Sequence, residues 1–405
     1  MNNKARKFFA ILLIVLLLII SSANYYGIKG IDNLAYVVAI GLDVGKNDAL
    51  NLSLQISMPT ISEGGSSSSQ SSSVVVDSIE CSSITSGISL FNSFLGKEVT
   101  LSHCKVLVIS EELAKKGVSE YLYTLSNNIE FRTDSNIIIS KCDAKTFLEY
   151  STPLLDKISA RYYDIAPSSS EYTGYTESIT CNEFLTAIND KYSEPSAILG
   201  SINISTTQKP SNNSSYAAGE TPISGDEPSV ETMGLAVFNS DKLVGELNGL
   251  ESICHLIISN KLKNAQIRIP SPIDGLDYID LYIELEKNTK NSVLLVNGSP
   301  YITSNICING KMQSMNDNIE LNDENVIAQI EQYAKSYVEQ NMYNYLYKTS
   351  TELHADIDNF GLYALKYFYN TSEWGQYNWP ARYKDAFFNV NVDFNLRSSY
   401  LLVST

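Results

Sequence analysis

The sequence is poor in the residues and motifs that usually carry catalysis or metal binding. It has three histidines in 405 residues, and it contains no G-x-S-x-G, P-loop or H-E-x-x-H motif. Those motifs mark esterases, nucleotide-binding proteins and zinc proteases, and histidine is the most frequent general base and metal ligand. The sequence therefore predicts a protein that is not an enzyme, with no catalytic residue, no cofactor and no metal ligand.

Two histidines stand beside other reactive side chains. His103 precedes Cys104, but in one strand over 99–110 the two side chains would point to opposite faces, which favours a packed or surface histidine. His255 follows Cys254 inside an apolar stretch, which indicates a core position. The sequence favours a structural role for both.

One further grouping leaves two readings open. His354, Asp356 and Asp358 place metal-binding side-chain types at alternate positions. A structural metal site is one interpretation. A solvated loop before Phe360 is the other, and we favour it.

Six cysteines occur without any C-x-x-C pair. Several lie in apolar runs such as Ile306–Ile308, so we expect buried thiols that act as small hydrophobic side chains.

Long apolar runs are also lacking, with one exception. Phe8 to Ile20 is unbroken and follows the basic residues Lys4, Arg6 and Lys7, the pattern of an export leader. Residues 1–23 are therefore predicted to be a membrane-spanning signal or anchor helix, and cleavage after Ala23 is the alternative. Because the first cysteine is Cys81, no lipobox follows the leader. The remaining chain is expected outside the cytoplasmic membrane.

Positive charge is in deficit: 29 Lys and Arg stand against 45 Asp and Glu, giving a net charge of −16. Phosphate backbones repel such a chain, which argues against nucleic-acid binding. Tyrosine is abundant at 26 residues, and it suits half-hydrated interfaces.

The length of the chain after the leader predicts two or three domains. In 24–200, apolar runs at 34–42 and 50–56 predict a strand hairpin, 84–95 a helix that ends at Gly96, and 99–110 one strand. This alternation predicts a mixed α/β domain. Residues 201–275 are a linker and a small middle domain with a hairpin at 233–245.

Residues 276–405 predict an α+β domain with a long helix, roughly 323–348, packed on one face of an antiparallel sheet. Separate strands are expected around 279–285 and 293–295, and another at 388–396. In the helix, Tyr333 and Tyr337 should face the core, whereas Tyr343, Tyr345 and Tyr347 are candidates for an interface.

Several blocks occur in an order that resembles one family. They are 31–43, 96–117, 131–134, 234–245 and 355–361 with Trp379. Together they are similar to the Ger(x)C family, the C subunits of nutrient germinant receptors in spore-forming bacteria.

The resemblance implies a non-enzymatic, three-domain exported subunit on the outer face of the spore inner membrane. It would act by contact with polytopic A- and B-type receptor subunits. Family members are usually lipoproteins with a cysteine directly after the leader, and this sequence departs from that pattern. Here an N-terminal helix would replace the lipid. The alternatives are a secreted cell-wall hydrolase or a solute-binding protein.

Overall fold

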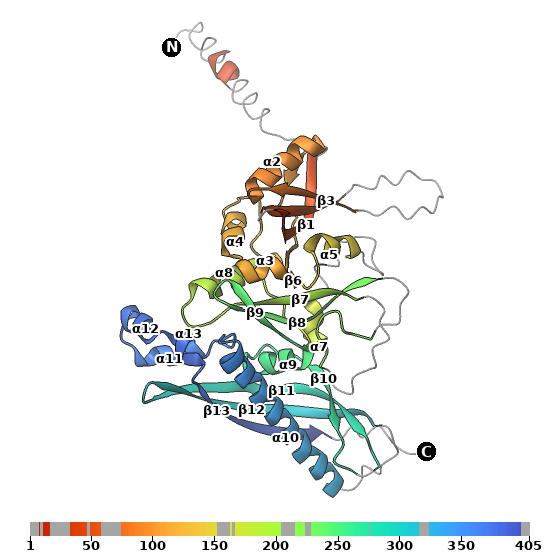
Figure 1. Cartoon of the computed structure of the whole chain (residues 1–405), viewed down its shortest axis with the longest axis vertical. Coiled ribbons are helices and arrows are strands. Elements are labelled where there is room, and N and C mark those ends of the chain that lie inside the picture. The colour runs from red at the N-terminus through yellow and green to blue at the C-terminus, as the bar shows by residue number, and fades with distance from the viewer. Residues whose placement is uncertain are drawn as a thin grey trace, which may run out of the picture.

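Two β-sheets with a buried helix between them make up the folded body in this computed structural model (Figure 1). The structure describes residues 33–46, 49–57, 74–151, 163, 167–203, 215–222, 228–273, 275–315 and 324–397, together with 8 and 11–16. Over these residues, every helix is too short or too polar to span a bilayer. The predicted leader lies largely outside them, so its role stays a prediction.

Nine strands of the described chain form the first sheet, in the order β3-β2-β1-β5-β6-β7-β8-β9 with β4 beside β1. Their bounds are β1 Leu34–Val44, β2 Leu50–Ser57, β3 Val74–Cys81, β4 Glu98–Thr100, β5 Val106–Ser110, β6 Asn136–Ser140, β7 Ser196–Asn203, β8 Ser229–Asn239 and β9 Lys242–Leu247. The central strands β1, β5, β6 and β7 are parallel.

Helices cover both faces of these parallel strands, which is why their sequences are continuously apolar. Leu107 and Ile109 face one cluster of core side chains, and Val106 and Val108 face the other. The first cluster includes side chains of four helices, α2 Ile84–Leu95, α3 Glu111–Lys116, α4 Ser119–Ser126 and α8 Cys181–Asn189. The second is built around α5 Ala144–Tyr150.

Most of the elements expected in the N-terminal part are present. The β1–β2 hairpin is confirmed, and α2 ends at Gly96 in the left-handed conformation. The single strand expected over 99–110 is wrong, because β4 and β5 are separate strands. His103 and Cys104 therefore lie in a turn, closed by a 3.0 Å bond from the Cys104 N–H to the Leu101 carbonyl.

The hairpin expected at 233–245 is confirmed as β8 and β9, and it joins the first sheet through β7. It leads into α9 (Gly249–Ile258), which lies between the two sheets (Figure 1). Nearly every residue of α9 is buried, because the helix is enclosed by the two sheets and α10. The three-domain division stays a prediction.

The second sheet has the order β10-β11-β12-β13. Its strands are β10 Ala265–Pro270, β11 Tyr278–Val296, β12 Ser299–Met315 and β13 Phe387–Arg397. The two strands expected at 279–285 and 293–295 are one, β11, with irregular pairing between Leu285 and Lys290.

The sheet is not wholly antiparallel as predicted, because β13 pairs with β12 in parallel. A parallel neighbour requires a crossover. The helices between the two strands supply it: α10 Glu324–Tyr347, α11 Phe360–Ala364, α12 Thr371–Tyr377 and α13 Trp379–Tyr383.

The long helix α10 packs against this sheet as expected, with Tyr333 and Tyr337 against the core. Tyr345 is fully buried, so its assignment to an interface is wrong. It follows Met342 by three residues, and the helical period therefore keeps it on the buried stripe. Tyr347 is exposed, whereas Tyr343 is half-buried and accepts the Val390 N–H at 3.0 Å.

All six cysteines are free thiols. Four are buried: Cys81, Cys104, Cys181 and Cys254. Burial raises the pKa of Cys181 and Cys254, which favours the inert protonated thiol.

Candidate functional site

A buried charged network joins three distant parts of the chain beside α9. His255 on α9 places its Nε2 2.9 Å from Glu177 Oε2 and its Nδ1 2.8 Å from Asp358 Oδ1. The Tyr345 hydroxyl donates to the other Asp358 oxygen at 2.8 Å, and Lys261 contacts Glu177. We call these five residues the joint network. It connects the segment before α8, the central helix α9 and the C-terminal region.

The joint network holds charges of both signs. Burial alone would lower the pKa of His255, but hydrogen bonds and charges from Asp358 and Glu177 outweigh it and raise that pKa to about 9. Burial likewise opposes ionisation of Glu177, yet His255 and Lys261 hold its pKa at about 2. Both ring nitrogens of His255 therefore donate to carboxylates, and the imidazolium and Lys261 balance the two acids.

The expectation that His255 is a simple core residue misses this role. One signal was present in the sequence: a histidine inside an apolar stretch needs polar partners if it is buried. The partners themselves could not be identified, because Glu177 and Asp358 are 78 and 103 residues away.

Asp356 lies close to the joint network, and it too is buried. Its carboxylate accepts the N–H groups of Phe360 at 3.1 Å and Gly361 at 2.8 Å, and the indole N–H of Trp379 at 2.8 Å. The Asp356 carbonyl accepts the Glu194 N–H at 2.8 Å. The favoured solvated loop is therefore wrong: this segment is fixed in the interior.

The three residues of the alternative metal grouping have separate partners. His354 Nδ1 lies 2.8 Å from the Ser350 carbonyl, Asp358 is engaged by His255, and Asp356 binds N–H groups. No cluster of metal-ligand side chains occurs in the described part of the chain. His103 is at the surface, with its ring edge-on to Tyr36 at 5.0 Å.

A cleft of about 440 Å³ opens next to the joint network. Residues of α8 and the segment after it form one wall, and Ile357 to Leu362 contribute to the other. Glu177 and Lys261 reach it from the network. Glu194 also lines the cleft, and its Oε2 accepts the Ser240 N–H at 2.5 Å. Burial raises the pKa of Glu194 to about 7.

This raised pKa predicts a specific pH dependence. Between pH 4.5 and about 7 the folded chain keeps a proton on Glu194 that the unfolded chain has lost. The free energy of unfolding therefore falls as pH rises through that window. The Glu194→Gln variant lacks this titration, so it should be more stable than the native chain at pH 8 by about 3 kcal/mol, and no more stable at pH 4.

Urea unfolding at the two pH values measures the difference. Asp356, whose pKa burial also raises to about 7, is present in both proteins and cancels in the comparison. Equal shifts at pH 4 and pH 8 would contradict the assignment.

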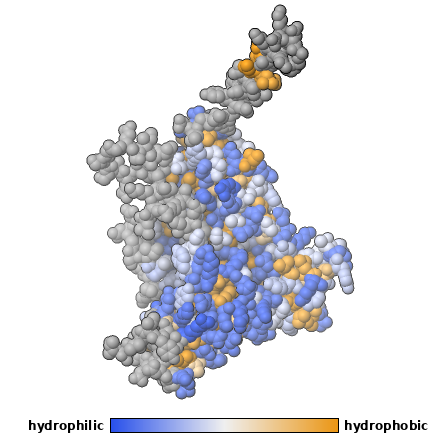
Figure 2. Space-filling model, turned by 180° about the vertical axis from the view of Figure 1, so that it is seen from behind, coloured by the Kyte–Doolittle hydropathy of each residue, from blue (hydrophilic) through white to orange (hydrophobic). Residues whose placement is uncertain are grey.

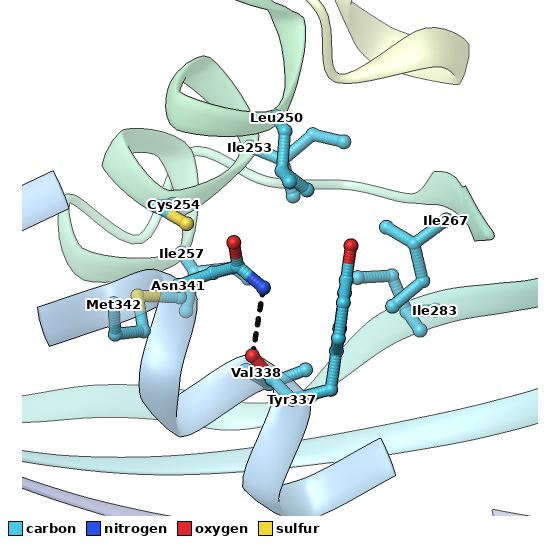
Figure 3. A pocket seen from close by; sticks show the side chains of 10 residues that line it. All are labelled: Leu250, Ile253, Cys254, Ile257, Ile267, Ile283, Tyr337, Val338, Asn341 and Met342. Atoms are coloured by element: carbon cyan, nitrogen blue, oxygen red, sulfur yellow. Dashed lines mark hydrogen bonds between the residues drawn. The ribbon is translucent and has the colours of Figure 1, made fainter. Parts of the chain in front are cut away.

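A second cavity, between α9, α10 and the second sheet, is a packing gap (Figure 3). Its volume is about 10 Å³, room for about one water molecule. The lining is mainly aliphatic, and Asn341 is turned back to the Tyr337 carbonyl at 2.8 Å. The gap has no room for an organic ligand.

The outer face of the second sheet carries an exposed apolar row. Leu294, Tyr301 and Phe387 are aligned across β11, β12 and β13, and the rings of Tyr301 and Phe387 stack at 4.9 Å. Val296 continues the row toward the hairpin turn. At that turn the Tyr377 hydroxyl donates a hydrogen bond to the Gly298 carbonyl at 3.0 Å. We call Leu294, Val296, Tyr301 and Phe387 the hairpin surface.

The hairpin surface is well exposed, with 43% of Tyr301 and 51% of Phe387 accessible to solvent. Figure 2 shows hydrophobic residues gathered on the side of the molecule where this hairpin and α11 to α13 lie. Such a patch on an otherwise polar face is typical of an interaction surface.

Comparison with known proteins agrees with this architecture. The family model "Spore germination protein N-terminal domain" matches residues 28–204, and "Spore germination B3/GerAC like, C-terminal" matches residues 233–400. Together they cover most of the chain, which therefore belongs to the Ger(x)C family of germinant-receptor C subunits in spore germination.

Among individual relatives, the chain is 25% identical to spore germination protein KC of Bacillus subtilis (strain 168) over 317 residues, 76% of each chain. It is 25% identical over 130 residues to the putative spore germination protein YfkR of the same organism, covering 31% of this chain and 33% of that protein. The crystal structure of the GerBC protein superposes with a TM-score of 0.52 at 13% identity, covering 88% of this chain and 96% of that one. That likeness shows a shared mixed α+β fold.

Proposed function

We propose that this chain is the membrane-anchored, extracytoplasmic C subunit of a nutrient germinant receptor. It is held on the outer face of the spore inner membrane by its N-terminal helix. It works without catalysis, through contacts with polytopic A- and B-type subunits. Family membership supports the place in germination, and the basic leader followed by an apolar run supports the anchor.

The observation that carries the contact role is the hairpin surface. Its four apolar side chains lie on the outer face of a sheet whose inner face is already packed against α10. Aromatic side chains are enriched at the centres of protein interfaces, where they supply large contact areas at low entropic cost. A polytopic subunit with an apolar extracytoplasmic loop would bury this row.

Co-purification from spores tests the proposal. Detergent should be required to extract the full-length chain from spore membranes, and the polytopic subunits should be recovered with it. The double variant Tyr301→Ser, Phe387→Ser should reduce that recovery at least tenfold, which corresponds to about 1.4 kcal/mol of binding free energy.

Tyr172→Ser is the matched control, because Tyr172 is an exposed tyrosine on α7 (Ser170–Thr173), outside the hairpin surface. It should leave recovery unchanged. Extraction of the native chain without detergent would refute the membrane anchor. Equal recovery of the polytopic subunits by the double variant and the wild type would refute the contact role of the hairpin surface.

A further inference from the structure

Helix α2 lies at the end of the folded body that holds the start of β1 (Figure 1). Three residues after α2 ends, Glu98 begins β4, which pairs in parallel with the first residue of β1, Leu34. The last turn of α2 is therefore beside the start of β1, the first strand after the predicted leader.

The composition of α2 is unusual for a surface helix. None of its twelve residues is ionisable. Ile84, Gly87 and Phe91 are buried on its inner face, as the 3.6-residue period requires. On its outer face Leu90 is 48% exposed and Phe94 is 66% exposed, one turn apart. A surface helix facing water normally carries charged residues on this face.

We propose that the outer face of α2 lies in the interfacial layer of the bilayer that holds the leader, with Leu90 and Phe94 inserted among the lipids. The inference rests on the proposed membrane anchor. An uncharged helix with apolar side chains on its outer face gains free energy when that face leaves water at the headgroup boundary. Lys97, one residue beyond the helix cap, can reach a lipid phosphate.

The length of the connecting chain favours lipid as the occupant. The stretch from Ser21 to Asn33 spans at most about 45 Å when fully extended. It includes Tyr25 and Tyr26, a residue type that is enriched at the membrane boundary. This connecting chain keeps α2 close to the membrane that holds the leader. Even a weak apolar contact between α2 and the lipids is then populated, because the two are already held together.

Tryptophan quenching by brominated lipids tests the contact. Full-length Phe94→Trp protein is reconstituted into vesicles of phosphatidylcholine and phosphatidylglycerol with brominated acyl chains. The signal of the native tryptophans, Trp374 and Trp379, is subtracted with wild-type protein. We expect the added tryptophan to lose at least half of its fluorescence relative to vesicles without bromine.

Leu362→Trp is the matched control, because Leu362 is an exposed apolar residue on α11 in the C-terminal region. It should show no quenching. If Phe94→Trp is unquenched while the protein sediments with the vesicles, α2 faces water or protein and the inference is overturned, although the anchor stands. If the protein does not sediment with vesicles, the anchor itself fails, and the inference falls with it.

Discussion

Replacing His255 with leucine should lower the free energy of unfolding by about 3–5 kcal/mol, because it leaves the buried Asp358 carboxylate without its cation and Glu177 with Lys261 alone. Leucine fills much of the same space, but Glu177 and Asp358 then face an apolar side chain at positions that are almost wholly buried. Denaturant unfolding at pH 7 measures the effect.

Lys261→Met provides the control. Lys261 contacts the Glu177 carboxylate, but its side chain is 49% exposed, so water can hydrate that carboxylate when the ammonium group is removed. We expect a loss below about 1 kcal/mol. Adding Glu177→Gln and Asp358→Asn to the His255→Leu variant should restore part of its stability, because the unpaired charges are then removed. Equal losses for His255→Leu and Lys261→Met would argue against an ionised network.

The second large effect is expected at Gly361 on α11. A Cβ at this position would lie 2.4 Å from the Tyr192 carbonyl oxygen and 2.8 Å from the Trp379 ring nitrogen. Neither group can move freely, since the carbonyl is backbone and the indole N–H is bonded to Asp356. Gly361→Ala should therefore destabilise the fold by about 3 kcal/mol through overpacking, as read from thermal or denaturant unfolding.

A glycine in the neighbouring helix α12 serves as the reference. A Cβ at Gly375 meets nothing within 4 Å. Gly375→Ala should be neutral or should stabilise the chain by up to about 1 kcal/mol, because alanine favours helix. If Gly361→Ala and Gly375→Ala had the same free energy of unfolding, the close contact between α11 and the segment around Tyr192 would not determine the stability of the fold.

Local sequence rules predicted much of the N-terminal part. Alternation and continuous apolar runs located β1 and β2, and Gly96 marked the end of α2. The break between β4 and β5 was not predicted, because Leu101 and Cys104 in the intervening turn are buried and prolong the apolar pattern. Burial pattern alone does not distinguish a strand from a packed turn.

In the C-terminal part, the alternation in β13 gave the strand but not its direction. A half-buried strand shows the same period whether its neighbour is parallel or antiparallel. The direction follows from the helical crossover that precedes β13. It also places Phe387 beside Tyr301 on the outer face, so the hairpin surface could not be recognised from the sequence.

The candidate site was hardest to predict because its chemistry depends on distant pairs. His255, Asp356 and Asp358 were each singled out, yet as a core residue and as members of a loop or metal grouping. Glu177 precedes α9 in the chain and Asp358 follows it, and only the fold shows that both contact the imidazole of His255.

The position of α9 has a mechanical consequence. The helix is packed between the sheets, and His255 is held by Glu177, which precedes α9 in the chain, and by Asp358, which follows it. Sliding one sheet over the other would separate the buried Asp358 carboxylate from the imidazolium that balances it. We therefore expect the two sheets to move as one rigid body and not about a hinge. A displacement of the hairpin surface would then be transmitted through α9 to the first sheet.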